Sequence, residues 1–309
     1  MDSNKPLASL VIFFYNQVDY VEESVQGALS QTYENLEIIL SDDCSTDGTY
    51  DKILKCIKDY HGAHTIIVNR NENNIGLVPH VNKVLFELSH GRFIFLQGGD
   101  DISLPNRVAD GMDCFKKNDS IYGLTCPAVI IDKEGNETGK MGIAKEKIVS
   151  LTDADYLSSS SFMCGVGPYA IRRAILDFFG PLNDDCQTED SCLRFRALLL
   201  GTLMASTQYN VKYRIHGNNI SIGNVVYKLS SYLIANQYRK DLKKCESILS
   251  LPLYEQLQRK IDYYETNREI EKNINCTSFL PVKYYMRIKK KLLRIRYEKR
   301  FNQYLHRVQ

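Results

Sequence analysis

The stretch SQTYENLEIILSDDCSTDGT, residues 30–49, carries a strand, a polar cluster and a helix start in immediate succession. Its apolar run Leu36–Leu40 predicts a buried strand, which ends in the acids Asp42 and Asp43. Ser, Thr and Asp side chains then precede a segment of helical spacing over Thr49–Tyr60, as at a capped helix start. Because one capping side chain is enough for a helix, carboxylates remain to accept hydrogen bonds from a base or a ribose.

The order of strand, polar residues and helix recurs between residues 8 and 100. The apolar runs predict four strands, Ala8–Phe14, Leu36–Leu40, His64–Asn69 and Arg92–Leu96. Three segments of helical spacing separate them, namely Tyr20–Gln31, Thr49–Tyr60 and Val78–Ser89. This alternation predicts an α/β fold with a Rossmann-like, mostly parallel sheet flanked by crossover helices.

Polar residues follow each of these four strands directly. The four clusters are Tyr15–Asn16, Asp42–Asp43, Asn73–Asn74 and Asp100–Asp101. The carboxyl ends of parallel strands line the crevice in which open α/β sheets bind their ligands. The sequence therefore predicts a ligand site at this edge of the sheet.

Residues 104–220 show a less regular order. The pattern predicts a helix over Asn106–Lys117, a strand near Gly123–Ile131, a loop with Lys133, Gly135 and Asn136, a polar segment Ser158–Ser161, and helices near Ile171–Phe178 and over Glu189–Leu200. From about Val225 the pattern is helical, with breaks at Pro252 and Pro281. We expect a domain over residues 1–222, divided into a nucleotide-binding half (1–103) and an acceptor-side half (104–222), and a helical C-terminal extension over 223–309.

The composition is that of a globular protein, with 44% hydrophobic and 25% charged residues in 309, which excludes wholesale disorder and collagen-like repeats. Nine cysteines without a C-x-x-C pair argue against a disulfide framework, a zinc ribbon or a redox pair and favour the cytoplasm. The start does not resemble a signal peptide, and the longest uncharged stretches, Tyr156–Ile171 and Ala197–Val211, are too short or too polar to span a bilayer. We therefore expect no integral membrane protein.

The C-terminal tail is strongly basic although the whole chain has a net charge of only +2. Residues 281–309 hold ten Lys and Arg against one acid, a charge of +9, so residues 1–280 carry 2 − 9 = −7. Four apolar residues at helical spacing lie among these charges: Tyr285, Ile288, Leu292 and Ile295. Such a helix either lies on an anionic bilayer or packs on the acidic body of the protein. Nucleic acid is a poorer explanation, because no recognised binding motif accompanies the charge.

Three further clusters carry chemistry. Two glycines precede Asp100 and Asp101, and a backbone that comes close to a ligand beside two carboxylates suits Mg²⁺ or Mn²⁺, although such a loop can also be a mere turn. The segment Tyr213–Ser221 places a cation and an imidazole in one loop, which suits a metal-bound diphosphate. Glu189 and Asp190 begin a helix, where acids commonly just complement the helix dipole, and Glu189 is given no further role.

Taken in order, these segments resemble the family 2 glycosyltransferases, enzymes of the GT-A fold that transfer a sugar from a nucleotide-diphosphate donor with inversion. The resemblance covers roughly residues 6–222. It rests on LVIFFYNQ (10–17), the stretch 30–49, NENNIG (71–76), GDDISLPNR (99–107), ED (189–190) and YRIHGNNIS (213–221). The second stretch is the specific one, and the ED pair alone would not identify the family.

The resemblance implies a role for each matching residue. Asp43 would hold the donor's base, usually uracil, and the nucleoside pocket would be lined by Tyr15, Asn16 and Asn74. Asp100 would bind the donor diphosphate through a divalent metal, Mg²⁺ or Mn²⁺, with Asp101 close by. Asp190 would be the catalytic base, and Arg214 and His216 would approach the diphosphate or its metal. The family commonly reads DADD where this chain has Gly98-Gly99-Asp100-Asp101, so the first carboxylate is missing.

The implied function is that of a hexosyltransferase-type enzyme of bacterial surface polysaccharide biosynthesis, such as O-antigen or capsule. A UDP-sugar would be its donor and a lipid-linked saccharide its acceptor, with acceptor contacts from residues 158–187 and the C-terminal helices. The enzyme would work in the cytoplasm or peripherally on the inner face of the plasma membrane. A non-catalytic nucleotide- or sugar-binding module of the same fold is the alternative, favoured by Gly98. A dinucleotide-dependent enzyme is disfavoured because no G-x-G-x-x-G and no P-loop occurs.

Overall fold

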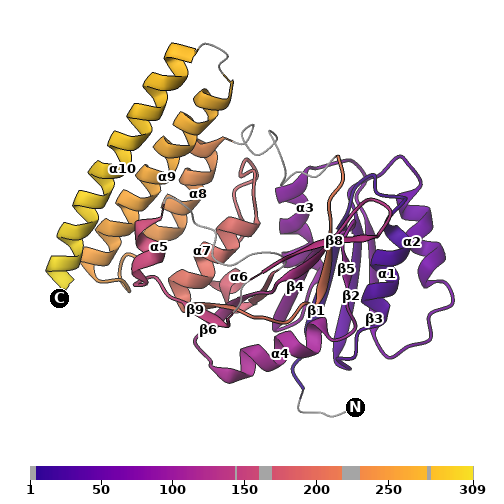
Figure 1. The fold of residues 1–309 in the computed structure, drawn as a ribbon. Coiled ribbons are helices and arrows are strands. Elements are labelled where there is room, and N and C mark those ends of the chain that lie inside the picture. Colours follow the sequence, from indigo (N-terminus) through magenta and orange to yellow (C-terminus); the bar gives the residue numbers. More distant parts are fainter. Residues whose placement is uncertain (1–4, 143–144, 160–168, 218–229, 277–279, 309) are drawn as a thin grey trace.

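The computed structural model describes residues 5–142, 145–159, 169–217, 230–276 and 280–308. Two sheets with helices on both faces form the main body, and three C-terminal helices form a layer beside it (Figure 1). Several sequence predictions fall at least partly outside the described residues: Ser160–Ser161 and the further acceptor segment up to 168, Asn218–Ser221 of the polar loop, and the helical onset near Val225.

The N-terminal half confirms the predicted parallel sheet. Its strands are β1 (Ala8–Phe14), β2 (Leu36–Asp42), β3 (Thr65–Arg70) and β4 (Phe93–Gly98). They lie in the order β3-β2-β1-β4, all parallel, and Ala8 pairs with Leu36 on one side and with Phe93 on the other. The strand order reverses between β1 and β4, which is the position where doubly wound sheets bind ligands.

Alternating side chains of the buried strands supply two cores, one on each face of the sheet. One face, with Leu10 and Ile12, is covered by α1 (Val21–Leu29), α2 (Thr49–Ile57) and α4 (Arg107–Lys117). The other face, with Val11 and Ile94, is covered by α3 (Leu77–Lys83), its π-helical continuation Val84–Leu88, α6 (Ala174–Phe179) and α7 (Asp190–Leu200).

The large sheet continues into the second half in the order β4-β10-β6-β11-β9. These strands are β10 (Tyr169–Arg172), β6 (Ile121–Thr125), β11 (Thr202–Ala205) and β9 (Lys147–Val149). β10 is antiparallel to both β4 and β6. The helix predicted from Ile171 begins at Ala174 instead, because Tyr169–Arg172 is a short apolar run buried between two strands, and periodicity alone does not separate such a run from a helix.

The single strand predicted over Gly123–Ile131 is two strands in different sheets. β6 ends at Thr125, and β7 (Ala128–Ile131) joins a small sheet in the order β5-β12-β7-β8. Pro127 lies between them, and proline has no N–H to donate to a ladder, so the first strand ends there. The other members are β5 (Ile102–Ser103), β8 (Glu137–Met141) and β12 (Val211–Arg214).

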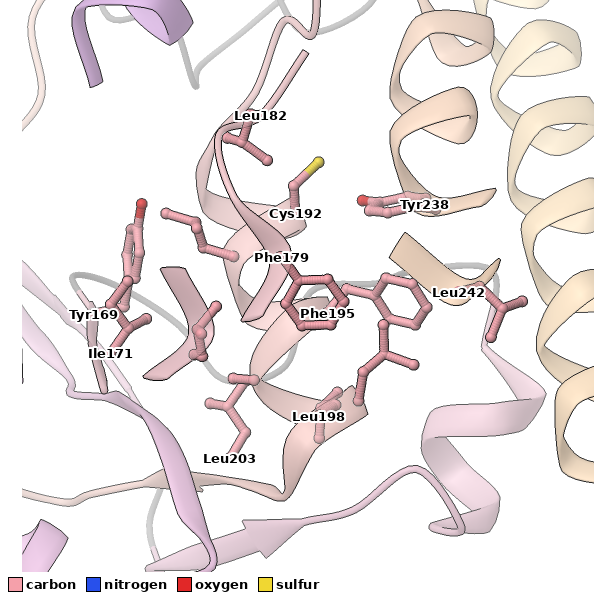
Figure 2. Packing of buried hydrophobic residues seen from close by; sticks show 14 of the residues in the cluster. Tyr169, Ile171, Phe179, Leu182, Cys192, Phe195, Leu198, Leu203, Tyr238 and Leu242 are labelled. Carbon is pink, nitrogen blue, oxygen red and sulfur yellow. The ribbon is translucent and has the colours of Figure 1, made fainter. Parts of the chain in front are cut away.

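The C-terminal layer consists of α8 (Ser231–Lys244), α9 (Leu251–Cys276) and α10 (Leu280–Val308), with α9 between the other two (Figure 1). Pro252 and Pro281 are the second residues of α9 and α10, where the missing N–H has no intrahelical partner to lose. α7 and α8 share an apolar interface in which Phe195 lies edge-to-face on Tyr238 (Figure 2), 5.3 Å between ring centroids.

The short helix α5 (Ala154–Ser158) joins the C-terminal layer to the main body. Lys260 of α9 donates to the carbonyl oxygens of Tyr156 (2.7 Å) and Ser159 (2.5 Å), and the Tyr297 hydroxyl of α10 donates to Leu157 O at 2.5 Å. The last carbonyls of α5 are therefore satisfied by α9 and α10. In the part of the chain that the structure describes, no helix is both long enough and apolar enough to cross a bilayer.

Candidate active site

Three strand ends bring the predicted site residues to one edge of the large sheet. Tyr169, the first residue of β10, pairs with Thr125, the last residue of β6, and the next β10 residue pairs with Phe95 in the middle of β4, so the start of β10 lies toward the carboxyl end of β4. Asp100 and Asp101 follow β4 after one residue, Gly99. The Tyr169 hydroxyl donates to Glu189 Oε1 at 3.4 Å, so the start of α7 lies at this same edge. The same edge therefore holds the residues that follow β1, β2, β4 and β6 and those that precede β10.

Asp43 organises the loop that follows β3. Its carboxylate accepts hydrogen bonds from Asn71 Nδ2 (2.8 Å) and from the backbone N–H groups of Ile75 and Gly76 (both 3.0 Å). A carboxylate offers about four lone-pair sites, and three are used here. Asp43 therefore holds the loop after β3 in place, and its contact with the donor's base remains a prediction.

The other residues predicted for the nucleoside pocket lie around Asp43. Asn16 has a positive φ of 51°, and its Oδ1 accepts from Thr46 N at 2.9 Å, so the loops after β1 and β2 are tied together. Asn74 Oδ1 accepts from Gly76 N at 3.1 Å in a local turn. Tyr15 is exposed beside Asn16, with its ring available to a planar ligand. Their contact with a base remains a prediction.

Asp100 and His216 form the most suggestive pair of the site. His216 Nε2 lies 2.9 Å from Asp100 Oδ2, and both side chains are largely buried. The imidazole stacks on the ring of Tyr20, with 5.2 Å between centroids and 29° between planes. Residues separated by 116 positions thus meet as a carboxylate and an imidazole at the end of β4.

Arg214 holds the backbone of this pair in place through several hydrogen bonds. Its Nε donates to Asp100 O (2.9 Å), its Nη1 to the carbonyls of Asp132 (3.0 Å) and Lys133 (3.2 Å), and its Nη2 to Glu23. The guanidinium also lies over the Tyr20 ring, 4.8 Å from the centroid. At least four of its five N–H donors therefore go to protein acceptors. Arg214 is a positioning residue in this structure, and direct contact with a diphosphate remains a prediction.

Asp101 points into the protein rather than toward His216. Its Oδ1 accepts from Arg214 N at 3.0 Å, and the side chain is buried. Burial raises the pKa of the Asp101 carboxyl well above its usual value, and the adjacent Asp100 charge adds to the increase. Because the Asp101 carboxylate binds the backbone of β12 while the Asp100 carboxylate faces His216, the geometry favours Asp100 over Asp101 for a metal.

A Cβ at either of the two glycines before these acids would make a close contact. A Cβ on Gly99 would lie 2.2 Å from Cδ1 of the buried Phe14, which cannot yield. A Cβ on Gly98 would lie 2.7 Å from Asp100 Oδ1. The Asp100 carboxylate thus occupies the space into which the side chain of the family's first acid would project.

The start of α7 holds a second pair of carboxylates. Asp190 Oδ1 accepts from Thr188 Oγ1 (2.6 Å) and from Ser191 N (2.5 Å), while its side chain stays 33% exposed. The guanidinium of Arg194 lies 4.0 Å from Asp190 Oδ2 and 4.9 Å from the centroid of the Tyr169 ring. Asp190 is therefore oriented by neighbours and remains open to solvent.

Glu189 has an environment that its helix position alone does not predict. Burial raises the pKa of its carboxyl to about 7, and the Asp190 charge adds to the increase. Burial also raises the pKa of the Tyr169 hydroxyl, which donates to Glu189. Cys126, the residue after β6, interacts electrostatically with both Arg107 and Arg194. Arg107 also interacts with Asp101, and Arg194 lies beside Asp190, so these two carboxyl groups belong to neighbouring parts of the site.

The donor chemistry of Asp100 and His216 fits a divalent cation such as Mn²⁺, because carboxylate oxygen and imidazole nitrogen are both ligands for it. Among the residues that the structure describes, no group of three or more His, Cys, Asp or Glu side chains is placed to hold a metal ion. A cation at this pair would therefore take its remaining ligands from a bound diphosphate and from water.

Sequence reasoning missed several residues that shape the site. Tyr20 and Glu23 look like ordinary helix residues at the start of α1, yet they hold His216 and Arg214. His80 of α3 lies buried below the β2 strand end, 2.6 Å from Ser41 Oγ, and burial lowers its pKa. No short-range motif marks these residues, since each acts on a partner far along the chain.

The chain belongs to the glycosyl transferase family 2, whose family model matches residues 9–179. It is a glycosyltransferase enzyme with the GT-A fold, as its sequence predicts. An uncharacterized glycosyltransferase of Haemophilus influenzae is 27% identical over 71% of this chain and 68% of its own length. The Escherichia coli protein described as UDP-Glc:alpha-D-GlcNAc-diphosphoundecaprenol beta-1,3-glucosyltransferase WfaP is 29% identical over 70% of this chain and 80% of its own.

Solved structures agree with the fold. S. aureus TarS in complex with UDP-GlcNAc superposes with a TM-score of 0.63 over 96% of this chain and 92% of that one, at 16% identity. The mannosyltransferase PcManGT of Pyrobaculum calidifontis, in complex with GDP-Man and Mn²⁺, gives 0.56 over 98% and 85%, at 13% identity. Among the first four curated relatives, the matched segments span between 46% and 80% of the relatives' own lengths.

Proposed function

We propose that this enzyme transfers a sugar from a UDP-sugar to a hydroxyl of a lipid-linked saccharide, with inversion, in the assembly of a bacterial surface polysaccharide such as O-antigen or capsule. The observation that carries the proposal is the pairing of Asp100 with His216 at 2.9 Å, at the same sheet edge as Asp43 and the start of α7. A nucleotide-diphosphate donor needs such an edge, with a site for its base and another for its phosphates.

Comparison with relatives supports the donor and the acceptor class. TarS was solved with UDP-GlcNAc and PcManGT with GDP-Man and Mn²⁺, so this fold holds nucleotide sugars in both. The printed description of WfaP names UDP-Glc as donor and a diphosphoundecaprenol-linked GlcNAc as acceptor. An acceptor of that kind resides in a membrane, so the proposed reaction would take place at a membrane surface, for which we propose the inner face of the plasma membrane.

The roles proposed for the chain's own residues follow from their positions. Asp43, Tyr15, Asn16 and Asn74 form the nucleoside end of the crevice. Asp100 and His216 would hold a Mg²⁺ or Mn²⁺ ion together with the donor diphosphate, and Arg214 fixes that pair. A divalent cation bound there supplies positive charge beside the departing diphosphate.

Asp190 would act as the general base. An acceptor hydroxyl gives its proton to the Asp190 carboxylate while its oxygen forms a bond to the anomeric carbon of the donor sugar. The bond from that carbon to the diphosphate breaks in the same step and releases the nucleoside diphosphate, which gives inversion. Thr188 Oγ1 and Ser191 N bind Oδ1 of Asp190, so we assign the proton to Oδ2, which Arg194 approaches only to 4.0 Å.

The test is donor hydrolysis, which needs no acceptor. We expect the protein to release nucleoside diphosphate from at least one nucleotide sugar in the presence of Mn²⁺ and to stop when EDTA is added. His216→Ala should lower the rate roughly 10-fold or more at limiting Mn²⁺, because loss of one of two protein ligands weakens the metal site. The exposed His61→Ala is the matched control and should behave as wild type. Nucleotide binding without turnover of any donor would instead support the binding-module alternative.

A further inference from the structure

Helix α10 has two apolar faces, and only one of them is buried by the protein. Tyr297, Phe301 and Tyr304 are buried. Tyr297 stacks on Tyr263 of α9, with 4.2 Å between centroids and 12° between planes. This face packs α10 on α9, whereas the apolar residues that the sequence analysis singled out lie on another face of the helix.

The opposite face carries what we call the outer stripe: Tyr284, Tyr285, Ile288, Leu292 and Ile295. These side chains are 68%, 62%, 42%, 59% and 51% exposed, respectively. With about 3.6 residues per turn they fall within roughly a third of the helix circumference, opposite the buried tyrosines. An apolar stripe of three turns that faces away from the protein marks a contact surface.

Basic side chains border the outer stripe on both sides. Lys289 and Arg296 lie along one border, and Arg287 and Lys291 along the other, all of them exposed. Residues 281–309 contain only one acid, Glu298, which pairs with Arg294 at 2.7 Å. The stripe is therefore apolar in its centre and positive at its edges.

We propose that the outer stripe of α10 docks on the surface of an anionic phospholipid bilayer. Its Leu and Ile side chains would enter the boundary between headgroups and acyl chains. Tyrosines suit that boundary because they have an apolar ring and a polar tip. The flanking lysines and arginines would contact lipid phosphates. A second copy of the chain is a poorer occupant, because two stripes packed together would bring basic borders of the same sign into contact.

The position of α10 in the molecule suits this role. The helix lies on the outside of the C-terminal layer, with α9 and α8 between it and the large sheet (Figure 1). A bilayer on its outer side would not cover the strand ends that form the site. Docking on the bilayer needs no substrate. It would also bring the site to a lipid-linked acceptor, and this second role rests on the proposed function.

Co-sedimentation with vesicles tests the proposal on the full chain. We expect binding to phosphatidylglycerol vesicles, little binding to phosphatidylcholine vesicles, and weaker binding as salt rises. The triple variant Ile288→Gln, Leu292→Gln, Ile295→Gln and the double variant Lys289→Glu, Lys291→Glu should each lower the partition coefficient at least about 10-fold. Circular dichroism and the thermal midpoint should match wild type, because every altered side chain is exposed.

Two matched controls separate the stripe from general effects. Lys55→Glu with Lys58→Glu makes the same charge change in α2 and at its C-cap, on the opposite side of the molecule. Ile248→Gln with Leu251→Gln removes exposed apolar side chains outside α10. Both should bind vesicles as wild type does. Equal binding by the stripe variants, no preference for anionic lipid, or a dimer that the stripe variants dissociate would each overturn the proposal. Donor hydrolysis by the same variants should be unchanged, which keeps this test separate from that of the proposed function.

Discussion

Gly98 shows how one missing side chain shapes the candidate metal site. The family commonly has an acid here, whereas in this chain the Asp100 carboxylate occupies the adjoining space and reaches His216. This arrangement depends on the absence of a Cβ at position 98.

We therefore expect Gly98→Ala to impair the site although alanine is small. The new Cβ would lie 2.7 Å from Asp100 Oδ1 and would push the carboxylate away from His216. The Mn²⁺ concentration for half-maximal donor hydrolysis should rise roughly 10-fold. Gly139→Ala, whose Cβ would meet only Ile130 Cδ1 at 3.8 Å, is the control. An unchanged Mn²⁺ requirement in Gly98→Ala would argue that the position of Asp100 is not important.

Glu189 should make stability depend on pH. With a folded-state pKa of about 7 and an unfolded value near 4.3, the folded protein keeps a proton that the unfolded chain has lost between these two pH values. The contribution of Glu189 to the free energy of unfolding is therefore fully present below about pH 4.3 and is lost as the pH rises through about 7. In full it amounts to about 3–4 kcal/mol, of which about 2–3 kcal/mol is lost between pH 5 and pH 8.

Urea unfolding of wild type and Glu189→Gln at pH 5 and pH 8 measures this contribution. Wild type should lose about 2–3 kcal/mol more than Glu189→Gln between the two pH values, since glutamine does not titrate. The exposed Glu246→Gln should follow wild type. Equal losses of unfolding free energy in wild type and Glu189→Gln would show that the Glu189 carboxyl does not titrate between pH 5 and pH 8 in the folded protein.

At the scale of elements, the junction between α7 and α8 depends on a fully buried ion pair. Arg196 Nε donates to Asp241 Oδ2 at 2.8 Å and Nη2 to Oδ1 at 3.0 Å, and Gln237 also donates to Asp241. Arg196 Nη1 further donates to Gly180 O at 2.8 Å, so the pair also holds the end of α6. Both charges are satisfied only while they face each other.

Arg196→Met should destabilise the protein by about 3–5 kcal/mol, because it leaves the Asp241 charge buried without its partner. The double variant Arg196→Met, Asp241→Leu should recover most of that loss, since two apolar side chains need no partner. Denaturant unfolding measures both. A double variant as unstable as the single one would show that the loss comes from packing rather than from the unpaired charge.

How much of the fold the sequence predicts depends on the element. The four parallel strands and their helices follow from local periodicity, and α7 starts within one residue of its predicted position. The segment Gly123–Ile131 is wrongly predicted as one strand because its apolar residues continue past Pro127, where the chain passes from one sheet to the other. β10 is wrongly predicted as part of a helix because a four-residue run is too short to show a period. For the site, motifs indicate Asp43, Asp100 and His216, whereas Tyr20, Glu23 and Glu189 act through tertiary contacts that no local pattern records.

At the scale of the whole molecule, the C-terminal layer links the proposed membrane contact to the body that holds the site. α10 carries the outer stripe, and the same helix contacts α5 through Tyr297. α8 packs on α7, whose first residue is Asp190. A single series of packed helices thus runs from the exposed face of α10 to the proposed base.

The assignment of Asp190 as the base is the central claim, and the kinetics of Asp190→Asn test it most directly. We measure nucleotide-sugar turnover together with UDP binding by calorimetry, using the exposed Asp185→Asn as the matched control. The account predicts that Asp190→Asn lowers turnover at least about 100-fold while its Kd for UDP stays within about twofold of wild type, and that Asp185→Asn changes neither. Turnover within a few-fold of wild type, or a loss of UDP binding that accounts for the loss of activity, would contradict it.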